Sequence, residues 1–164
     1  MEERLARMCL AAVVEPGRPG VAQLLAEFGA EAAWQAMLTG AESSPLAQRA
    51  RRVVPQALID ATAAVGLRFL IPSDPNWPIR LSDLADCEPV NDLSGVPIGL
   101  WVGGHGDPAE LCHKAVSMVG SRASTAYGDT VAAEMAAELS EGGRTVISGG
   151  AYGIDAAAHR GCLA

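Results

Sequence analysis

Two glycine-containing turns in the last third of the chain constrain its fold more than any other feature. They lie in AVSMVGSRASTAYG at residues 115–128 and in TVISGGAYGIDAAAH at residues 145–159. Each joins a short β-branched run to an alanine-rich run with helical spacing, which predicts strand–turn–helix twice in succession. In such a parallel arrangement both turns lie at the same end of the sheet, where backbone N–H groups can face an anion.

The second half of the chain is therefore predicted to be an α/β structure. The predicted elements are strands at 115–119 and 144–148 and helices at 124–141 and 153–162. This order is the first half of a doubly wound parallel fold. Because parallel sheets usually continue to more strands, we expect an exposed sheet edge and interpret the chain as a fragment, marginally stable, dimeric or part of a longer product.

The second turn runs from Ser148 to Gly153 and is dominated by glycine. Glycine has no Cβ, so a phosphate can lie against the main chain at the start of the following helix. Asp155 lies in the first helical turn, where its carboxylate is expected to cap free N–H groups. One Asp and one His, His159, do not make a metal site.

The first turn is predicted to have the same design. Gly120, Ser121 and Arg122 follow the strand, and the hydroxyl of either Ser124 or Thr125 is expected to cap the next helix. The guanidinium of Arg122 has a bidentate geometry that suits phosphate. The alternative is a solvated arginine paired with a nearby acid.

The first 66 residues are predicted to form a small helical domain. The expected helices span 2–14, 21–28, 30–38 and 45–64, with a break at Gly29. Apolar residues recur at helical spacing and are expected to form its core. They include Leu5, Met8, Leu24, Leu25, Phe28, Trp34 and Leu38.

A lead-in segment, residues 67–110, connects the two halves. Its strand-like pieces at 68–71 and 98–102 are predicted to extend the later sheet, and Trp77 and Trp101 are expected to be buried against it.

Charge and composition limit the possible functions. The net charge is -7, with six basic and twelve acidic residues after position 66, which argues against a broad basic surface. A local cleft can still hold phosphates within a Debye length of about 8 Å. The cysteines Cys9, Cys87, Cys112 and Cys162 form no CxxC pair, so no zinc site, redox motif or cofactor is indicated. No signal peptide or membrane-spanning run is recognised, so a cytoplasmic location is expected.

The order of residues at both turns resembles the DNA-processing protein A family (DprA, also called Smf). The matching motifs are VGSRxxSxYG, then VISGGAxGIDxxAHxG, with DPNWP at 74–78 and PIGLWVGG at 97–104 upstream. The resemblance is moderate over residues 1–66 and strong from about residue 68. In many members the second turn reads SGLARGID, whereas Gly150 and Tyr152 here replace the Leu and the Arg. Tyr152 is expected to pack on its loop, with stacking on a base as the alternative.

The resemblance implies a SAM-like helical domain at 1–66 and an incomplete Rossmann-like domain at 67–164. It implies a non-enzymatic protein that binds single-stranded DNA, protects incoming DNA and loads the RecA recombinase in natural transformation, with homodimerisation when full-length. Phosphates are then expected at both turns, held by amides, hydroxyls and one guanidinium. The predicted contact residues are Gly120, Ser121, Arg122, Ser124, Tyr127, Gly128, Ser148, Gly149, Gly150, Ala151, Gly153 and Asp155.

Two other function classes stay open. Rossmann-like phosphoribohydrolases of the lysine-decarboxylase-like family have similar glycine turns, but their PGGxGTxxE motif does not occur in these 164 residues. A module that binds a mononucleotide at the same turns is the third possibility. Such a sensor would saturate with free nucleotide, whereas a strand binder would prefer oligonucleotides and weaken steeply with salt.

Overall fold

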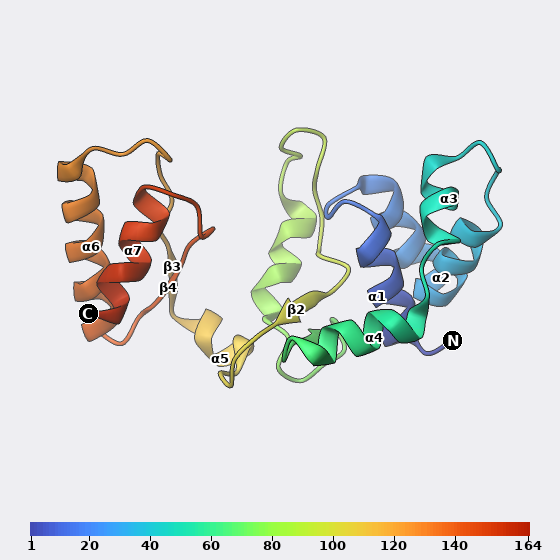
Figure 1. The fold of residues 1–164 in the computed structure, drawn as a ribbon, viewed down its shortest axis with the longest axis horizontal. Helices are drawn as coiled ribbons and strands as arrows, with labels where there is room; N and C mark the ends of the chain where they lie inside the picture. Colours follow the sequence, from blue (N-terminus) through green and yellow to red (C-terminus); the bar gives the residue numbers. More distant parts are fainter. The chain divides into compact units, whose positions relative to one another are not determined.

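The computed structural model describes residues 1–164 except for the side chain at position 19, and it shows a mixed α/β chain that is mostly helical. Contacts divide the chain into two compact units, Met1–Gly106 and Asp107–Ala164, each with its own two-stranded sheet (Figure 1). No helix in the described part of the chain combines the length and the hydrophobicity needed to cross a bilayer.

The first unit begins with four helices. The predicted break at Gly29 is confirmed, because this residue has a φ of 79° and interrupts α2. The single helix predicted over 45–64 is wrong, since it is two helices. Val54 precedes a proline and is extended (φ -101°, ψ 104°), which ends one helical segment before the next begins. The helices are α1 (Glu3–Val13), α2 (Pro19–Leu38), α3 (Pro45–Ala50) and α4 (Pro55–Ala64).

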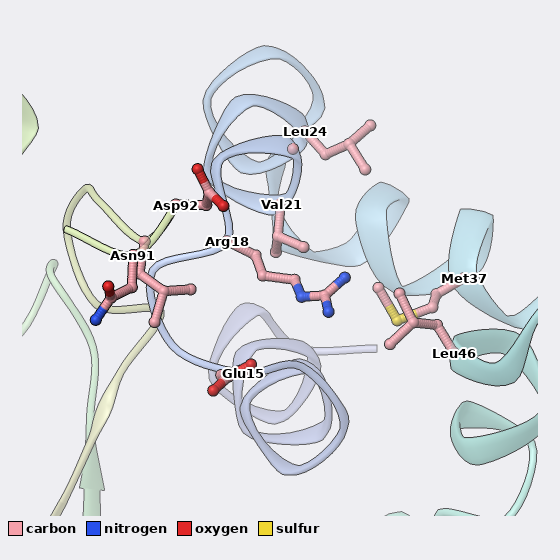
Figure 2. A pocket seen from close by; sticks show the side chains of 10 residues that line it. Glu15, Arg18, Val21, Leu24, Met37, Leu46, Asn91 and Asp92 are labelled. Carbon is pink, nitrogen blue, oxygen red and sulfur yellow. The ribbon is translucent and has the colours of Figure 1, made fainter. Parts of the chain in front are cut away.

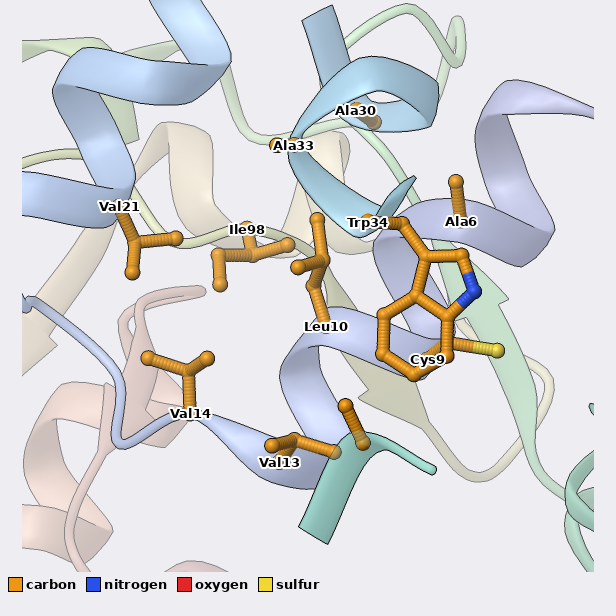
Figure 3. Close-up of a cluster of buried hydrophobic side chains, with 11 residues drawn as sticks. Ala6, Cys9, Leu10, Val13, Val14, Val21, Ala30, Ala33, Trp34 and Ile98 are labelled. Carbon is orange, nitrogen blue, oxygen red and sulfur yellow. The ribbon is translucent and has the colours of Figure 1, made fainter. Parts of the chain in front are cut away.

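The core of the first unit lies between α1 and α2 and includes Ala50 of α3 and Ile98 (Figure 3). Leu10, Cys9 and Trp34 are its largest fully buried side chains. Burying a side chain such as Leu10 contributes about 1.5–3 kcal/mol. Among the predicted core residues, Phe28 is wrong, because it is 63% exposed. The other predicted core residues are confirmed. Met8 and Trp34 are buried, and four leucines are partly buried and pack against the core: Leu5, Leu24, Leu25 and Leu38.

The lead-in strands β1 (Arg68–Leu70) and β2 (Leu100–Val102) pair with each other in antiparallel fashion and form a separate sheet. The prediction that they extend the later sheet is therefore wrong. Phe69 is the reason, because it is buried beside Met8 of α1 and stacks edge-on against Trp101, with the ring centroids 4.7 Å apart. These contacts join β1 and β2 to the helices. Trp77 is buried as expected, whereas Trp101 is 38% exposed.

The chain thus divides by contacts after Gly106, whereas the sequence pattern changes near residue 66. The segment between them also contains a 3-10 helix, η1 (Ile79–Asp86).

An ion pair fixes the lead-in segment to α1. The guanidinium of Arg4 donates to both carboxylate oxygens of Asp74, at 2.6 and 2.7 Å, and to the carbonyl oxygen of Phe69 at 2.9 Å. Asp74 also accepts the backbone N–H of Ile71 at 2.9 Å. The hydrogen bond from Arg4 lowers the pKa of the Asp74 carboxyl. The pair therefore stabilises the fold only while Asp74 is ionised.

We expect Asp74→Asn to lower the free energy of unfolding at pH 7 by about 1 kcal/mol, a modest value because Arg4 is partly in water. The pKa of Asp74 is lower in the folded state than in the unfolded chain, where Asp titrates near about 3.9. The destabilisation caused by the substitution should therefore have its full size above about pH 4 and become smaller as the pH falls further, because Asp74 is then protonated in the wild type as well. Urea unfolding followed by tryptophan emission measures it. Asp83→Asn, which breaks the exposed Arg80–Asp83 pair, is the control and should change little.

The second unit has the predicted order of strands and helices. Its strands β3 and β4 are parallel, with Ala115 opposite Thr145 and Ser117 opposite Ile147, and the N–H of Met118 donates to the carbonyl of Ile147 at 2.9 Å. The predicted pairs of strands and helices are confirmed, with bounds that differ by one or two residues: both strands and the first helix are shorter than predicted, and the last helix begins and ends one residue later. The elements are α5 (Pro108–His113), β3 (Ala115–Ser117), α6 (Ala126–Glu141), β4 (Thr145–Ile147) and α7 (Ile154–Leu163).

Helices α6 and α7 lie side by side in the second unit (Figure 1). Their contact is built from small buried residues, among them Ala132 and Ala136 of α6 and Ala157 of α7. Gly161 of α7 lies so close to α6 that a Cβ there would overlap with the carbonyl oxygen of Ala133. The two helices therefore pack backbone against backbone.

Candidate functional site

The two glycine turns lie at the carboxyl ends of β3 and β4 and contact each other directly. The N–H of Ile154 donates to the carbonyl oxygen of Ser121 at 3.2 Å. Gly153 has φ 79° and ψ -128°, a conformation that is essentially restricted to glycine, and a Cβ there would overlap with the carbonyl oxygen of Ser121. The expected meeting of the two turns at one end of the sheet is therefore present, and Gly153 is where they touch.

The carboxylate of Asp155 links the two turns by accepting one hydrogen bond from each. One oxygen of its carboxylate accepts the N–H of Gly120 at 3.3 Å, and the other accepts the N–H of Ala151 at 3.4 Å. The side chain is buried, and Gly149 lies against it, since a Cβ there would be 3.0 Å from the carboxylate. Both accepted amides come from the turns. The expectation that this carboxylate caps free N–H groups is confirmed, and both of these groups lie upstream of α7.

This arrangement removes two donors from the predicted phosphate contacts, because Gly120 and Ala151 already donate to Asp155. The sequence feature that could have indicated this role is an acid, Asp155, at the second position of a helix that follows a glycine turn. That signal shows a carboxylate near free amides, but it does not show that one of them comes from the other turn.

The hydroxyls of the first turn have separate structural tasks. Thr125 is the N-cap of α6, accepting the N–H of Gly128 at 3.1 Å, which settles the choice between it and Ser124. The hydroxyl of Ser124 instead donates to the carboxylate of Asp129. The other oxygen of Asp129 lies 3.8 Å from the guanidinium of Arg160 on α7. Ser124 therefore belongs to the α6–α7 contact.

Several donors at the turns have no partner among the described residues. They include the backbone N–H groups of Ser121, Arg122, Gly149 and Gly150 and the guanidinium of Arg122. Ser121, Arg122, Gly149 and Gly150 are all exposed. The hydroxyl oxygen of Ser148 is buried and makes no hydrogen bond to any residue that the structure describes. Unpaired amides beside a free guanidinium form an arrangement that can hold an anion.

Tyr127 and Gly128 lie in the first turn of α6. They line an apolar cavity of about 500 Å³ together with Val119, Met135 and other residues of β3, α6 and α7. Tyr127 is 79% exposed. Of the predicted contact residues, these two therefore border an apolar surface and not the free amides.

The first unit has a cavity of its own, which contains none of the predicted contact residues. It has a volume of about 630 Å³, and the side chain of Arg18 extends into it between α1 and α2 (Figure 2). Glu15 and Asp92 add two carboxylates to its wall, so a polyanion would meet more negative than positive charge there.

The described residues contain neither a cluster of metal ligands nor a disulfide. No group of three His, Cys, Asp or Glu side chains is arranged to hold a metal ion. The four cysteines are free, and burial raises the pKa of the Cys9 thiol.

The fold and the site define a mixed α/β protein with two adjoining glycine turns at the ends of parallel strands. The family model described as DNA recombination-mediator protein A matches residues 68–164. The chain belongs to this family.

Two curated relatives come from Mycobacterium tuberculosis, strains CDC 1551 and H37Rv, and carry the provisional name DNA processing protein DprA. Each is 37% identical over 163 residues, which cover 94% of this chain. The chain spans 41% of the length of these relatives. The resemblance seen in the motifs is thereby confirmed.

Proposed function

We propose that the chain binds single-stranded DNA by holding backbone phosphates at the two adjoining turns. The observation that carries the proposal is the set of unpaired amides on two turns that contact each other, with the exposed and unpaired guanidinium of Arg122 on the first of them. The hydroxyl of the exposed Ser121 adds a further donor, because it accepts the N–H of Ala123 at 3.2 Å and keeps its own proton available. Contacts of these kinds recognise phosphate and carry little sequence information. Asp155 positions the turns and does not itself touch the strand.

The acidity of the second unit does not oppose this proposal strongly. Three of its acids, Glu134, Glu138 and Glu141, lie in the C-terminal half of α6, roughly 12, 18 and 22 Å along the helix from its first residue at a rise of about 1.5 Å per residue. These distances exceed the Debye length of about 8 Å at physiological salt, so the three charges are largely screened at the first turn. Asp129, which is nearer, pairs with Arg160.

We expect Arg122→Ala to weaken binding of an oligothymidine by about 1–3 kcal/mol, the usual loss for a hydrogen bond to a charged group. Fluorescence anisotropy of a labelled oligonucleotide at low salt measures the change. Arg144→Ala is the matched control. It removes the same charge from the same unit, but at the amino end of β4, and should change binding much less.

Equal effects of the two arginine substitutions would indicate general electrostatic attraction and contradict the assigned site. Competition separates the remaining classes. A strand binder should prefer the oligonucleotide over a mononucleotide and weaken steeply with salt. Saturation by a mononucleotide would favour a nucleotide sensor, and release of free base from a nucleotide would favour a phosphoribohydrolase.

Family membership supports a wider role. We propose a non-enzymatic cytoplasmic protein that protects incoming DNA, loads RecA during natural transformation and forms homodimers. On the same basis we propose that residues 67–164 are part of a Rossmann-like DNA-processing domain. The helices of residues 1–66 are proposed to be SAM-like.

A further inference from the structure

Tyr152 lies on the second turn with its side chain in solvent. It is 87% exposed, and its hydroxyl makes no hydrogen bond among the described residues. The expectation that it packs on its own loop is therefore wrong. Its neighbours on the loop, Gly150 and Gly153, both have positive φ. An aromatic ring that is left in water can recover favourable free energy by covering an apolar surface of a ligand.

The position of Tyr152 places its backbone close to the proposed phosphate donors. It directly precedes Gly153, which lies against the carbonyl groups of Ser121 and Arg122. Consecutive Cα atoms are about 3.8 Å apart. The Cα of Tyr152, from which the ring extends, is therefore one residue from Gly153, where the two turns meet, and two residues from Gly150, whose amide is free. A nucleotide whose phosphate is held at the turns has its base within reach of this ring.

We propose that Tyr152 stacks on a nucleobase of the bound strand. The inference rests on the proposed function and adds the chemical class of the ligand. Stacking on an aromatic side chain needs a base that is free of its duplex neighbours, and it tolerates any base because each has a π-face. The site then selects single strands that carry bases over duplex DNA and over phosphate compounds without a base.

The other exposed tyrosine does not share this arrangement. Tyr127 lies on α6 and lines the apolar cavity with Val119 and Met135. Of the two tyrosines, Tyr152 is the one that lies on a turn with free amides.

The test compares two oligonucleotides of equal length, an oligothymidine and a chain of abasic sites, which carry the same phosphates. We expect Tyr152→Ala in the 164-residue chain to weaken oligothymidine binding about tenfold and abasic binding less than twofold. Tyr152→Phe keeps the ring and should bind like the wild type. Phe28→Ala removes an aromatic side chain that is 63% exposed on α2 and should leave both affinities unchanged.

The outcomes separate this inference from the function on which it rests. If Tyr152→Ala weakens binding of both oligonucleotides equally, the stacking role is overturned. It is also overturned if the substitution weakens neither, and the ring would then be free to contact a protein partner. Circular dichroism of each variant identifies a loss of folding. If wild type binds neither oligonucleotide, or if Arg122→Ala has no effect, the proposed function fails and the stacking role fails with it.

Discussion

Gly153→Ala is expected to destabilise the second unit by about 3 kcal/mol and to abolish oligonucleotide binding. The alanine would have to adopt φ 79°, which strains an L-residue by roughly 1–3 kcal/mol. Its Cβ would also overlap with the carbonyl oxygen of Ser121, so the turns would have to separate. Because the free donors come from both turns, their separation should remove the site as well as the stability.

Thermal unfolding followed by circular dichroism measures the first effect, and anisotropy measures the second. All three tryptophans lie in the first unit, so their emission should be unchanged by the substitution. Gly143→Ala is the matched control. This glycine also has a positive φ, 70°, but a Cβ there meets nothing within 4 Å. It should cost about 1 kcal/mol and leave binding intact. Equal effects at both positions would refute the contact between the turns.

Gly161→Ala is expected to destabilise the second unit by about 2 kcal/mol or more, although alanine is the better helix former. The new Cβ would overlap with backbone atoms of Ala133, which cannot rotate away as a side chain does. The two helices would therefore have to move apart and lose part of their buried contact. The shift of the melting temperature measures the loss.

Gly128→Ala provides the comparison for this second substitution. It is also a helical glycine, but its Cβ would lie 3.4 Å from the Cδ1 of Ile154, which is an ordinary contact. Here we expect a small gain of about 0.5–1 kcal/mol from helix propensity. A melting temperature that rises for both variants would show that α6 and α7 are not packed as closely as described.

Much of the second unit could be predicted from the sequence because its signals are local. Short β-branched runs, glycine turns and alanine-rich helices indicate the order of elements, and the structure has that order. The lead-in strands were assigned to the wrong sheet because pairing depends on distant contacts. The packing of Phe69 on Met8 and Trp101 joins β1 to the helices, and no local pattern reports it. Phe28 followed the helical spacing but lies just before the break at Gly29.

The candidate site could be predicted only in outline. Glycines after neighbouring parallel strands placed the two turns together, which the contact between Ser121 and Ile154 confirms. Which groups remain free depends on hydrogen bonds across the turns. Asp155 uses the amide of Gly120, 35 residues away along the chain, and the exposure of Tyr152 depends on the course of its loop. Such information exists only once the backbone is in three dimensions.

The backbone contact between α6 and α7 has a further consequence for ligand capture. The first turn leads into α6 and the second into α7, and Gly161 holds these helices against each other at Ala133. A shift of either helix would disturb that contact. We therefore expect the turns to be ordered before a phosphate bound as proposed arrives, which would spare an entropic cost of about 0.5–1.5 kcal/mol per ordered side chain.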